Sequence, residues 1–275
     1  MTIRKIFESN ILLFGYGKMG GALLDGWKNS GLKLKNTYVF EPNPSEELLN
    51  LVESGANLNP TAPIEAGICI LAVKPQVVDK LLSFFPKNVT FPLLISVIAG
   101  TPLSKFKSAF GSEVSIFRVM PNTPALVSAG ISAIYGESNI KREDFEKVEI
   151  LMSAVGNTVL LDNEQAIDAV TAISGSGPAY TFLMIEAMAN TGVELGLSYE
   201  TSLKLAKNTV FGSGKLSLQV NLSPQTLREN VTSPGGTTEA ALNILLNKDK
   251  FRLTMKEAIK SAHQKSIELR GLVKS

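Results

Sequence analysis

Short runs of apolar residues recur along the first part of the chain, and segments with helical spacing separate them. The runs are rich in β-branched residues and lack the alternation of apolar and polar positions that a half-exposed strand shows. Strands that are buried on both faces, in a parallel sheet covered by helices, have this pattern. We therefore predict a doubly wound α/β sheet with right-handed crossovers. The predicted strands are ILLF (11–14), TYVF (37–40), ICILAV (68–73), LLISVI (93–98) and VSIFRV (114–119).

Two further runs and a change of pattern complete the predicted architecture. GISAIY (130–135) and NTVLL (157–161) flank a predicted helix over 141–156 and extend the same sheet. After residue 162 the spacing is helical. We therefore predict an α/β domain over residues 1–162 and an all-α domain over residues 163–275. The predicted helices of the second domain cover residues 164–173, 179–196, 200–220, 238–247 and 251–271.

The helix predicted over 179–196 is apolar on most of its circumference, with residues such as Phe182, Leu183 and Met188. A helix that is hydrophobic all round has to be buried on all sides. The other helices of one small domain can hardly enclose it. We therefore predict that the helical domain forms a homodimer, in which a second copy of the chain supplies the missing cover.

Composition mainly excludes classes of protein. Hydrophobic residues make up 44% of the chain and charged residues 19%, a globular balance that rules out disorder as the main state. A net charge of +2 is too small to favour nucleic acid as a partner. The most apolar windows are too short for a membrane-spanning helix, and the polar N-terminus lacks a targeting pattern. We expect a soluble, cytoplasmic protein without nucleic-acid or membrane partners.

Histidine and cysteine are too rare for several kinds of chemistry. The chain has one of each, His263 and Cys69, so it has no intrachain disulfide and no Cys/His zinc cluster, and no metal site is predicted. A Ser-His-Asp triad would have to use His263. That residue lies in a charged helical pattern that is typical of a solvated surface. We therefore expect a bound cofactor to supply the chemistry.

The motif GYGKMG (15–20) follows the first predicted strand and begins a helix. In a Rossmann-type turn, Gly15 would allow the tight turn, Gly17 the approach of a pyrophosphate, and Gly20 close packing of the helix on the strand. The helix N-terminus would present free N–H groups to the phosphates. The motif predicts dinucleotide binding, with a plain strand–helix turn as the alternative. The predicted cofactor-binding residues here are Gly15, Tyr16, Gly17, Lys18, Met19 and Gly20.

An acidic residue follows the motif at the expected distance of about 20 positions, at the end of the second strand. Glu41 could accept hydrogen bonds from the adenosine ribose hydroxyls, and its charge would repel a 2′-phosphate. Residues 42–49 contain no arginine or lysine to offset that charge. The charge argument favours NADH over NADPH; a loop glutamate without a ligand is the alternative.

Two other segments follow predicted strands at the edge of the sheet where ligands bind. LAVKPQ (71–76) would border the nicotinamide half of the cofactor, with a solvated lysine before a turn proline as the alternative. RVMPNTPALV (118–127) occupies the same relative place after a later strand and directs polar side chains toward the cleft. These segments add Ala72, Val73, Lys74, Pro75, Asn122 and Thr123 to the predicted cofactor-binding residues.

Two glycine-rich loops precede helices of the second domain. SGSGPAY (174–180) includes Ser176, and SPGGTTEAAL (233–242) has two glycines and two threonines at a helix start. Such a junction presents unpaired N–H groups and hydroxyls to a carboxylate. The alternative for the second loop is ordinary capping, with Thr237 or Thr238 as the N-cap. Two such loops, in a chain with no other visible substrate site, favour binding of a small-molecule substrate.

At these residues the sequence resembles pyrroline-5-carboxylate reductase, over almost the whole chain. The resemblance depends on GYGKMG, LAVKPQ, RVMPNTPALV and, most specifically, the pair AISGSGPAY and SPGGTTEAAL. It implies a Rossmann domain and a helical domain that interlocks with a second subunit, often within rings of dimers. It also implies reduction of Δ1-pyrroline-5-carboxylate to L-proline, the last step of proline synthesis, with NADPH or NADH.

Carried over to this chain, the resemblance gives a role to each motif. GYGKMG, the Lys74-Pro75 turn and the Asn122-Thr123 loop correspond to cofactor contacts. The site for the substrate carboxylate and ring nitrogen corresponds to Ser233, Gly235, Gly236, Thr237 and Thr238, together with Ser176. Family members that prefer NADPH usually have small polar or basic residues where Glu41 stands, so this departure agrees with the charge argument.

The implied reaction suits a chain with a single histidine. A protonated cyclic imine is already an electrophile, so the enzyme mainly has to orient two ligands and exclude water. We expect Thr238 to hydrogen-bond the ring nitrogen and to be the catalytic residue, while Ser233 and Thr237 hold the carboxylate. Two alternatives stay open: a β-hydroxyacid dehydrogenase using one of three lysines in the helical domain, and a dinucleotide sensor without turnover. The lysines are Lys204, Lys207 and Lys215.

Overall fold

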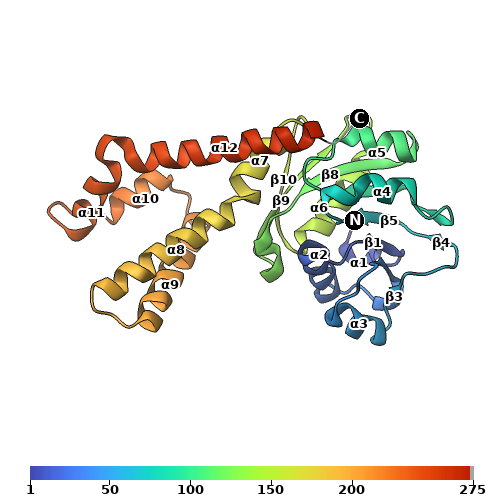
Figure 1. Ribbon diagram of the computed structural model, residues 1–275, viewed down its shortest axis with the longest axis horizontal. Coiled ribbons are helices and arrows are strands. Elements are labelled where there is room, and N and C mark those ends of the chain that lie inside the picture. The colour runs from blue at the N-terminus through green and yellow to red at the C-terminus, as the bar shows by residue number, and fades with distance from the viewer. Residues whose placement is uncertain (273–275) are drawn as a thin grey trace. The chain divides into compact units, whose positions relative to one another are not determined.

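The computed structural model describes residues 1–272, which form two compact units (Figure 1). The first unit contains Met1–Ser176 and the chain from Ala262 onward, and the second is Gly177–Ser261. The last helix, α12 (Lys250–Leu272), therefore begins in the second unit and ends in the first. The sequence-based division into an α/β domain over 1–162 and a helical domain over 163–275 stays a prediction.

The first unit is built on an eight-stranded sheet with the order β10-β9-β8-β7-β5-β1-β2-β3. Each strand predicted from an apolar run is present, although β5 and β7 end two residues before their runs do, and the extension by β9 and β10 is confirmed. A separate pair, β4 (Ile64–Glu65) with β6 (Val89–Thr90), lies outside the sheet order. The strands of the main sheet are β1 (Ile11–Phe14), β2 (Thr37–Phe40), β3 (Asn57–Leu58), β5 (Ile68–Leu71), β7 (Leu93–Ser96), β8 (Ser115–Met120), β9 (Gly130–Gly136) and β10 (Gly156–Leu160).

Neighbouring strands are parallel except at one place, where β9 is antiparallel to β8. The connection from β8 to β9 contains only the short 3₁₀ turn η3 (Thr123–Val127). Parallel neighbours need a crossover of a dozen or more residues, so a link this short returns the chain antiparallel. β10 follows the longer helix α6 (Arg142–Ser153) and is parallel to β9.

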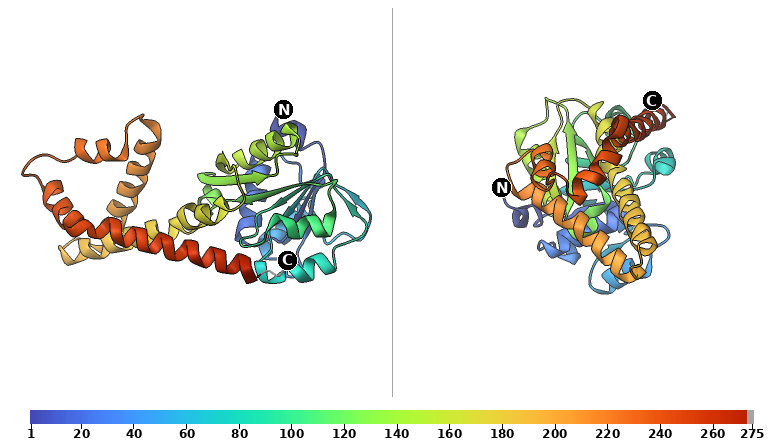
Figure 2. Two further views of the ribbon diagram at one scale, coloured as in Figure 1. Left: turned by 90° about the horizontal axis from the view of Figure 1, so that it is seen from above. Right: turned by 90° about the vertical axis from the view of Figure 1, so that its left-hand side faces the viewer.

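The central strands of the sheet are buried on both faces, and helices lie on the two sides of the sheet (Figure 2). Leu13, Ile70 and Ile95 point into one core, which includes the fully buried Trp27 of α2. Alternate residues of the same strands, such as Cys69 and Leu94, point into the other core. This double burial explains why the strands read as unbroken apolar runs. The helices of this unit up to β8 are α1 (Ile3–Ile6), α2 (Lys18–Asn29), α3 (Glu46–Glu53), α4 (Val78–Ser83) and α5 (Leu103–Phe110).

The strand order places β1 between β2 and β5, so that the chain winds outward in both directions from the middle of the sheet. Ile11 pairs with Thr37 on one side and with Ile68 on the other. In an open parallel sheet, the crevice beyond the carboxyl ends of such central strands is where ligands bind. This topology brings the turns after β1, β2 and β5 together.

The second unit is helical, as predicted, and contains one helix that the pattern did not predict, α10 (Pro224–Asn230). α8 (Gly177–Glu194) packs against α9 (Tyr199–Gln219). A Cβ added at Gly192 would lie 2.5 Å from Ser202 Oγ, so this glycine permits close packing of the two helices. The unit also contains α11 (Thr237–Leu246) and the short 3₁₀ turn η5 (Asn247–Asp249).

Most of the apolar surface of α8 is exposed in the single chain. Phe182 and Leu183 are 62% and 65% exposed, and on this helix only Ala189 is buried. The predicted lack of cover within one chain is therefore present in the structure. Within residues 1–272, no helix is both long and apolar enough to cross a membrane.

Candidate functional site

The GYGKMG turn joins β1 to α2, and its glycines meet different steric demands. Gly15 has φ +93°, and a Cβ there would lie 2.8 Å from the carbonyl oxygen of Ala72. A Cβ at Gly20 would lie 2.2 Å from the carbonyl oxygen of Gly15, a contact that no side chain could make. Gly17 is different, because no atom lies within 4 Å of the place where its Cβ would be. The first and third glycines close the turn, and the second leaves the backbone open to a ligand.

The start of α2 offers free backbone donors to that open space. Gly17 is the N-cap residue, and no side chain caps the helix. Lys18 is exposed and Met19 is half-buried at the first turn. Unsatisfied N–H groups at a helix N-terminus make a site for phosphate. Burial and the charges of nearby acidic groups raise the pKa of Tyr16 to about 12, so its hydroxyl stays protonated at neutral pH.

Glu41 lies directly beside this turn, at the end of β2. The backbone N–H of Tyr16 donates to Glu41 Oε2 over 2.9 Å, and the N–H of Asn43 donates to Oε1 over 3.1 Å. The amide of Asn59 also bonds the Glu41 backbone. The structure thus joins two residues that the sequence analysis assigned to the cofactor, Tyr16 and Glu41, although 25 positions separate them.

A cavity of about 590 Å³ opens at this place. Phe40, Glu41, Asn59 and Val73 contribute to its wall, and so do two side chains of the α4 region, Lys80 and the exposed Phe84. Sequence reasoning missed Lys80, because it searched for basic residues only in the segment that follows Glu41. The spatial neighbour comes from a helix about 40 positions later. The cavity therefore contains a cation as well as the predicted carboxylate.

The other predicted cofactor residues lie after β5 and β8. The N–H of Ala72 donates to the carbonyl oxygen of Phe14 over 2.8 Å, which extends the β1–β5 pairing to the turn. Lys74 is exposed just before the 3₁₀ turn η2 (Pro75–Val77). Asn122 is buried, and its Oδ1 accepts a hydrogen bond of 2.9 Å from the N–H of Ile131, while Thr123 is exposed. Asn122 thus has a structural partner of its own.

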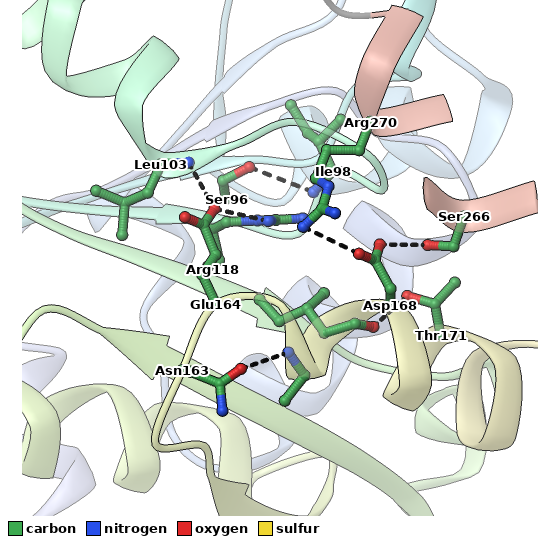
Figure 3. A network of polar contacts seen from close by, with 12 residues as sticks. Ser96, Ile98, Leu103, Arg118, Asn163, Glu164, Asp168, Thr171, Ser266 and Arg270 are labelled. Carbon is green, nitrogen blue, oxygen red and sulfur yellow. Dashed lines mark hydrogen bonds and ion pairs between the residues drawn. The ribbon is translucent and has the colours of Figure 1, made fainter. Parts of the chain in front are cut away.

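A network of polar contacts, which sequence reasoning also missed, lies on one side of the sheet (Figure 3). The buried Arg118 donates to Glu164 over 2.7 Å, and Glu164 also accepts from the N–H of Leu103. Asp168 accepts from Ser266 Oγ over 2.7 Å and pairs with Arg270 over 3.1 Å. Within the first unit, the network joins α7 (Ala166–Val170) to the end of α12 through Asp168.

Ser176 follows this network. The helix predicted over 164–173 is divided into α7 and a π-helical turn over Thr171–Gly175. The N–H of Ser176 donates to the carbonyl oxygen of Thr171 over 2.8 Å, which closes the wide turn. π-Turns are rare and often occur at functional sites. Ser176 is half-buried at the end of this turn.

The loop over 233–238 leads into α11, and its local structure differs from ordinary capping. The N-cap residue is Gly236, without a side-chain cap, so the alternative in which Thr237 or Thr238 is the N-cap is wrong. Gly235 has φ +71°, and its N–H donates to Glu239 Oε2 over 2.8 Å. Glycine competes well with threonine at an N-cap. The threonine hydroxyls are therefore not used for capping, and Ser233 is exposed next to them.

The comparisons with known proteins identify the family. Residues 164–269 match the family model described as pyrroline-5-carboxylate reductase dimerisation, and residues 10–100 match the model described as NADP oxidoreductase, coenzyme F420-dependent. The pyrroline-5-carboxylate reductase of Pseudomonas aeruginosa is 35% identical over 267 residues, which cover 94% of this chain and 96% of that protein. That of Synechocystis is 42% identical over 86% of this chain and 82% of its own length.

The chain belongs to the pyrroline-5-carboxylate reductase family. A solved structure agrees: the Plasmodium falciparum pyrroline carboxylate reductase with NADP bound superimposes with a TM-score of 0.83, at 31% identity, over 95% of this chain and 98% of that one. The chain is therefore an NAD(P)H-dependent enzyme of proline biosynthesis that reduces pyrroline-5-carboxylate to proline.

Family membership decides between the functions that the sequence left open. The β-hydroxyacid dehydrogenase and the sensor without turnover are both set aside, because near full-length relatives of this reductase are 35% and 42% identical. The match to a dimerisation domain also supports the predicted homodimer. The matched residues include the exposed helix α8.

Proposed function

We propose that this reductase binds its cofactor along the GYGKMG turn and the cavity beside Glu41, and that it prefers NADH to NADPH. The observation that carries the preference is the position of the Glu41 carboxylate, which two backbone N–H groups hold in the cavity wall. The substrate site that we propose is the loop over 233–238 with Ser176.

The residues present fit a dinucleotide. Gly17 leaves open space where a pyrophosphate can approach the backbone, and the uncapped start of α2 supplies donors for it. Glu41 is an acceptor at the end of β2, where the ribose hydroxyls of a dinucleotide need one. We assign the remaining contacts to the turns after β5 and β8, through Ala72, Val73, Lys74, Pro75, Asn122 and Thr123.

The preference for NADH follows from charge. A 2′-phosphate carries negative charge, and a carboxylate within a few ångströms repels it, whereas a ribose diol can donate hydrogen bonds to the same oxygens. Lys80 opposes this effect, since it lines the same cavity and is exposed. Glu41 is the stronger influence because its carboxylate is fixed by two hydrogen bonds, while Lys80 is a flexible surface cation.

When bound, the reduced cofactor would supply the hydride that adds to the carbon of the substrate C=N bond, and the residues of this chain would orient the two ligands. Thr238 Oγ1 accepts a hydrogen bond from the protonated ring nitrogen, which orients the ring and favours the electrophilic form. Ser233, Thr237 and the backbone N–H groups at the start of α11 bind the substrate carboxylate, with Gly235 and Gly236 keeping the backbone open to it. The amine produced takes its next proton from water.

We also propose that the homodimers assemble into larger rings and that the enzyme is cytoplasmic. The family resemblance supports the first proposal. Size-exclusion chromatography with light scattering tests the ring: a mass of several dimers supports it, and a mass of one dimer contradicts it.

Replacing Glu41 tests the basis of the cofactor preference. In Glu41→Ser, we expect the ratio of kcat/KM for NADPH to kcat/KM for NADH to rise about tenfold, which corresponds to about 1.4 kcal/mol of lost repulsion. Steady-state rates with both cofactors measure this ratio. Glu53→Ser, at the C-terminal end of α3, removes an exposed carboxylate outside the cavity and serves as the control. An unchanged ratio in Glu41→Ser contradicts the role proposed for Glu41.

A further inference from the structure

Asn59 forms an unusual double hydrogen bond with the backbone of Glu41. The N–H of Glu41 donates to Asn59 Oδ1 over 2.9 Å, and Asn59 Nδ2 donates to the carbonyl oxygen of Glu41 over 2.8 Å. One side-chain amide thus satisfies both polar groups of one peptide residue. Within a parallel sheet, a neighbouring strand forms hydrogen bonds with both the N–H and the C=O of every second residue.

The course of the backbone at Asn59 explains why a side chain, and not a neighbouring strand, forms these hydrogen bonds with Glu41. β3 pairs with β2 over only two residues, Tyr38 with Asn57 and Val39 with Leu58. Asn59 then turns into the left-handed region, with φ +44°, while its own N–H still donates to the carbonyl oxygen of Val39. The backbone leaves the sheet at this point. The amide of Asn59 continues the strand pairing past the end of β2.

The result is that Glu41 is held at both its backbone and its carboxylate. The Asn59 amide fixes the peptide groups, and the N–H groups of Tyr16 and Asn43 each donate to one carboxylate oxygen. A carboxylate can accept about four hydrogen bonds, so each oxygen keeps a lone pair for a ligand. Glu41 and Asn59 both line the cavity, which places this fixed acceptor at its wall.

We propose that Asn59 is a positioning residue that sets the discrimination between NADH and NADPH, by holding Glu41 where its charge faces the 2′ position of the ribose. This inference deepens the proposed function and rests on the cofactor site described there. Without the amide, the Glu41 backbone loses both of its hydrogen bonds to Asn59, and only the N–H groups of Tyr16 and Asn43 still hold the carboxylate. The carboxylate is then less firmly fixed opposite the 2′ position. Lys80, which lines the same cavity, then faces a 2′-phosphate with a less firmly fixed opposing charge.

Asn59→Gly distinguishes the positioning role of the Asn59 amide from a role of the residue in the backbone turn alone. Asparagine is common in the left-handed region, so a residue at φ +44° can be present for its backbone alone. Glycine adopts that conformation freely and lacks the amide. Asn59 is exposed, so its replacement leaves no cavity in the core.

Asn57→Gly is the matched control. Asn57 Nδ2 also bonds backbone carbonyl oxygens next to β2, those of Lys35 and Thr37, at 3.2 and 3.1 Å. These contacts lie at the start of β2, whereas those of Asn59 lie at its end. Both variants lose one asparagine amide from the same edge of the sheet. Only Asn59→Gly loses the hydrogen bonds to the Glu41 backbone.

The experiment measures the dissociation constants of NADH and NADPH by fluorescence titration, without substrate, in the full-length dimer. We expect Asn59→Gly to lower the ratio of the NADPH to the NADH constant at least about fivefold, while Asn57→Gly leaves it within about twofold of the wild type. In a Glu41→Ser background, Asn59→Gly should no longer change the ratio. Both single variants should keep the wild-type thermal unfolding temperature within a few degrees.

If Asn59→Gly leaves the ratio of the two dissociation constants unchanged, the inference is overturned and Asn59 has only a structural role. This outcome includes the case in which both affinities fall by the same factor. A shift that persists without Glu41 also overturns it. The proposed preference is judged separately, by the wild-type ratio. If the wild type binds NADPH more tightly, that preference fails, yet a Glu41-dependent shift in Asn59→Gly still supports the positioning role.

Discussion

Turnover by Thr238→Ala is expected to fall about tenfold to a hundredfold, while the affinity for reduced cofactor stays the same. A hydrogen bond that involves a charged group contributes about 1.5–3 kcal/mol, and each 1.4 kcal/mol is about tenfold in rate. In the structure the Thr238 hydroxyl caps no helix, because Gly236 is the N-cap of α11. Its removal should therefore have little effect on folding.

Stopped-flow or steady-state kinetics give kcat, and fluorescence titration gives the dissociation constant of NADH. Thr238→Ser keeps a hydroxyl at the same position and should restore most of the rate, which a purely structural role would not require. Wild-type turnover in Thr238→Ala would remove this residue from the proposed site. An equal loss of turnover in the alanine and serine variants would assign the effect to the methyl group rather than the hydroxyl.

The second large effect is expected at α8, where Leu183→Glu should convert the homodimer to monomers and abolish most of the activity. Leu183 is 65% exposed in the single chain, so a charge there disturbs little within the subunit. In the dimer, the same charge would be buried without a partner, which costs several kcal/mol. We expect the dimer dissociation constant to rise at least about a thousandfold, which corresponds to about 4 kcal/mol.

Analytical ultracentrifugation over a range of concentrations measures this constant. Leu183→Met keeps an apolar side chain of similar volume and should stay dimeric. A stable, active dimer in Leu183→Glu would show that this part of α8 is not the interface. The exposed apolar side chains of α8 would then need another explanation.

The sequence was sufficient for the features that depend on local pattern. Strands such as β1 could be predicted because both faces of the sheet are buried, which makes every residue of the strand apolar. The turn at Gly15–Gly20 could be predicted because only glycine satisfies the contacts at its first and third glycines. The exposed face of α8 followed from counting apolar positions around one helix.

Features that depend on distant parts of the chain could not be predicted in this way. Lys80 reaches the cavity of Glu41 because α4 returns to the same edge of the sheet. The Arg118–Glu164 pair joins residues that are 46 positions apart, and its polar partners are not part of any periodic pattern. The cap of α11 was uncertain for a different reason, since glycine and threonine are both acceptable N-cap residues and stand side by side.

The most direct test of the reductase activity follows the loss of reduced-nicotinamide absorbance after the purified enzyme is mixed with pyrroline-5-carboxylate. NADH and NADPH are used in parallel. We expect oxidation of both cofactors, formation of an equal amount of proline, and a higher kcat/KM with NADH. A higher kcat/KM with NADPH would contradict the role given to Glu41 and leave the reductase assignment intact. No oxidation of either cofactor, by a folded dimer that binds them, would contradict the central claim.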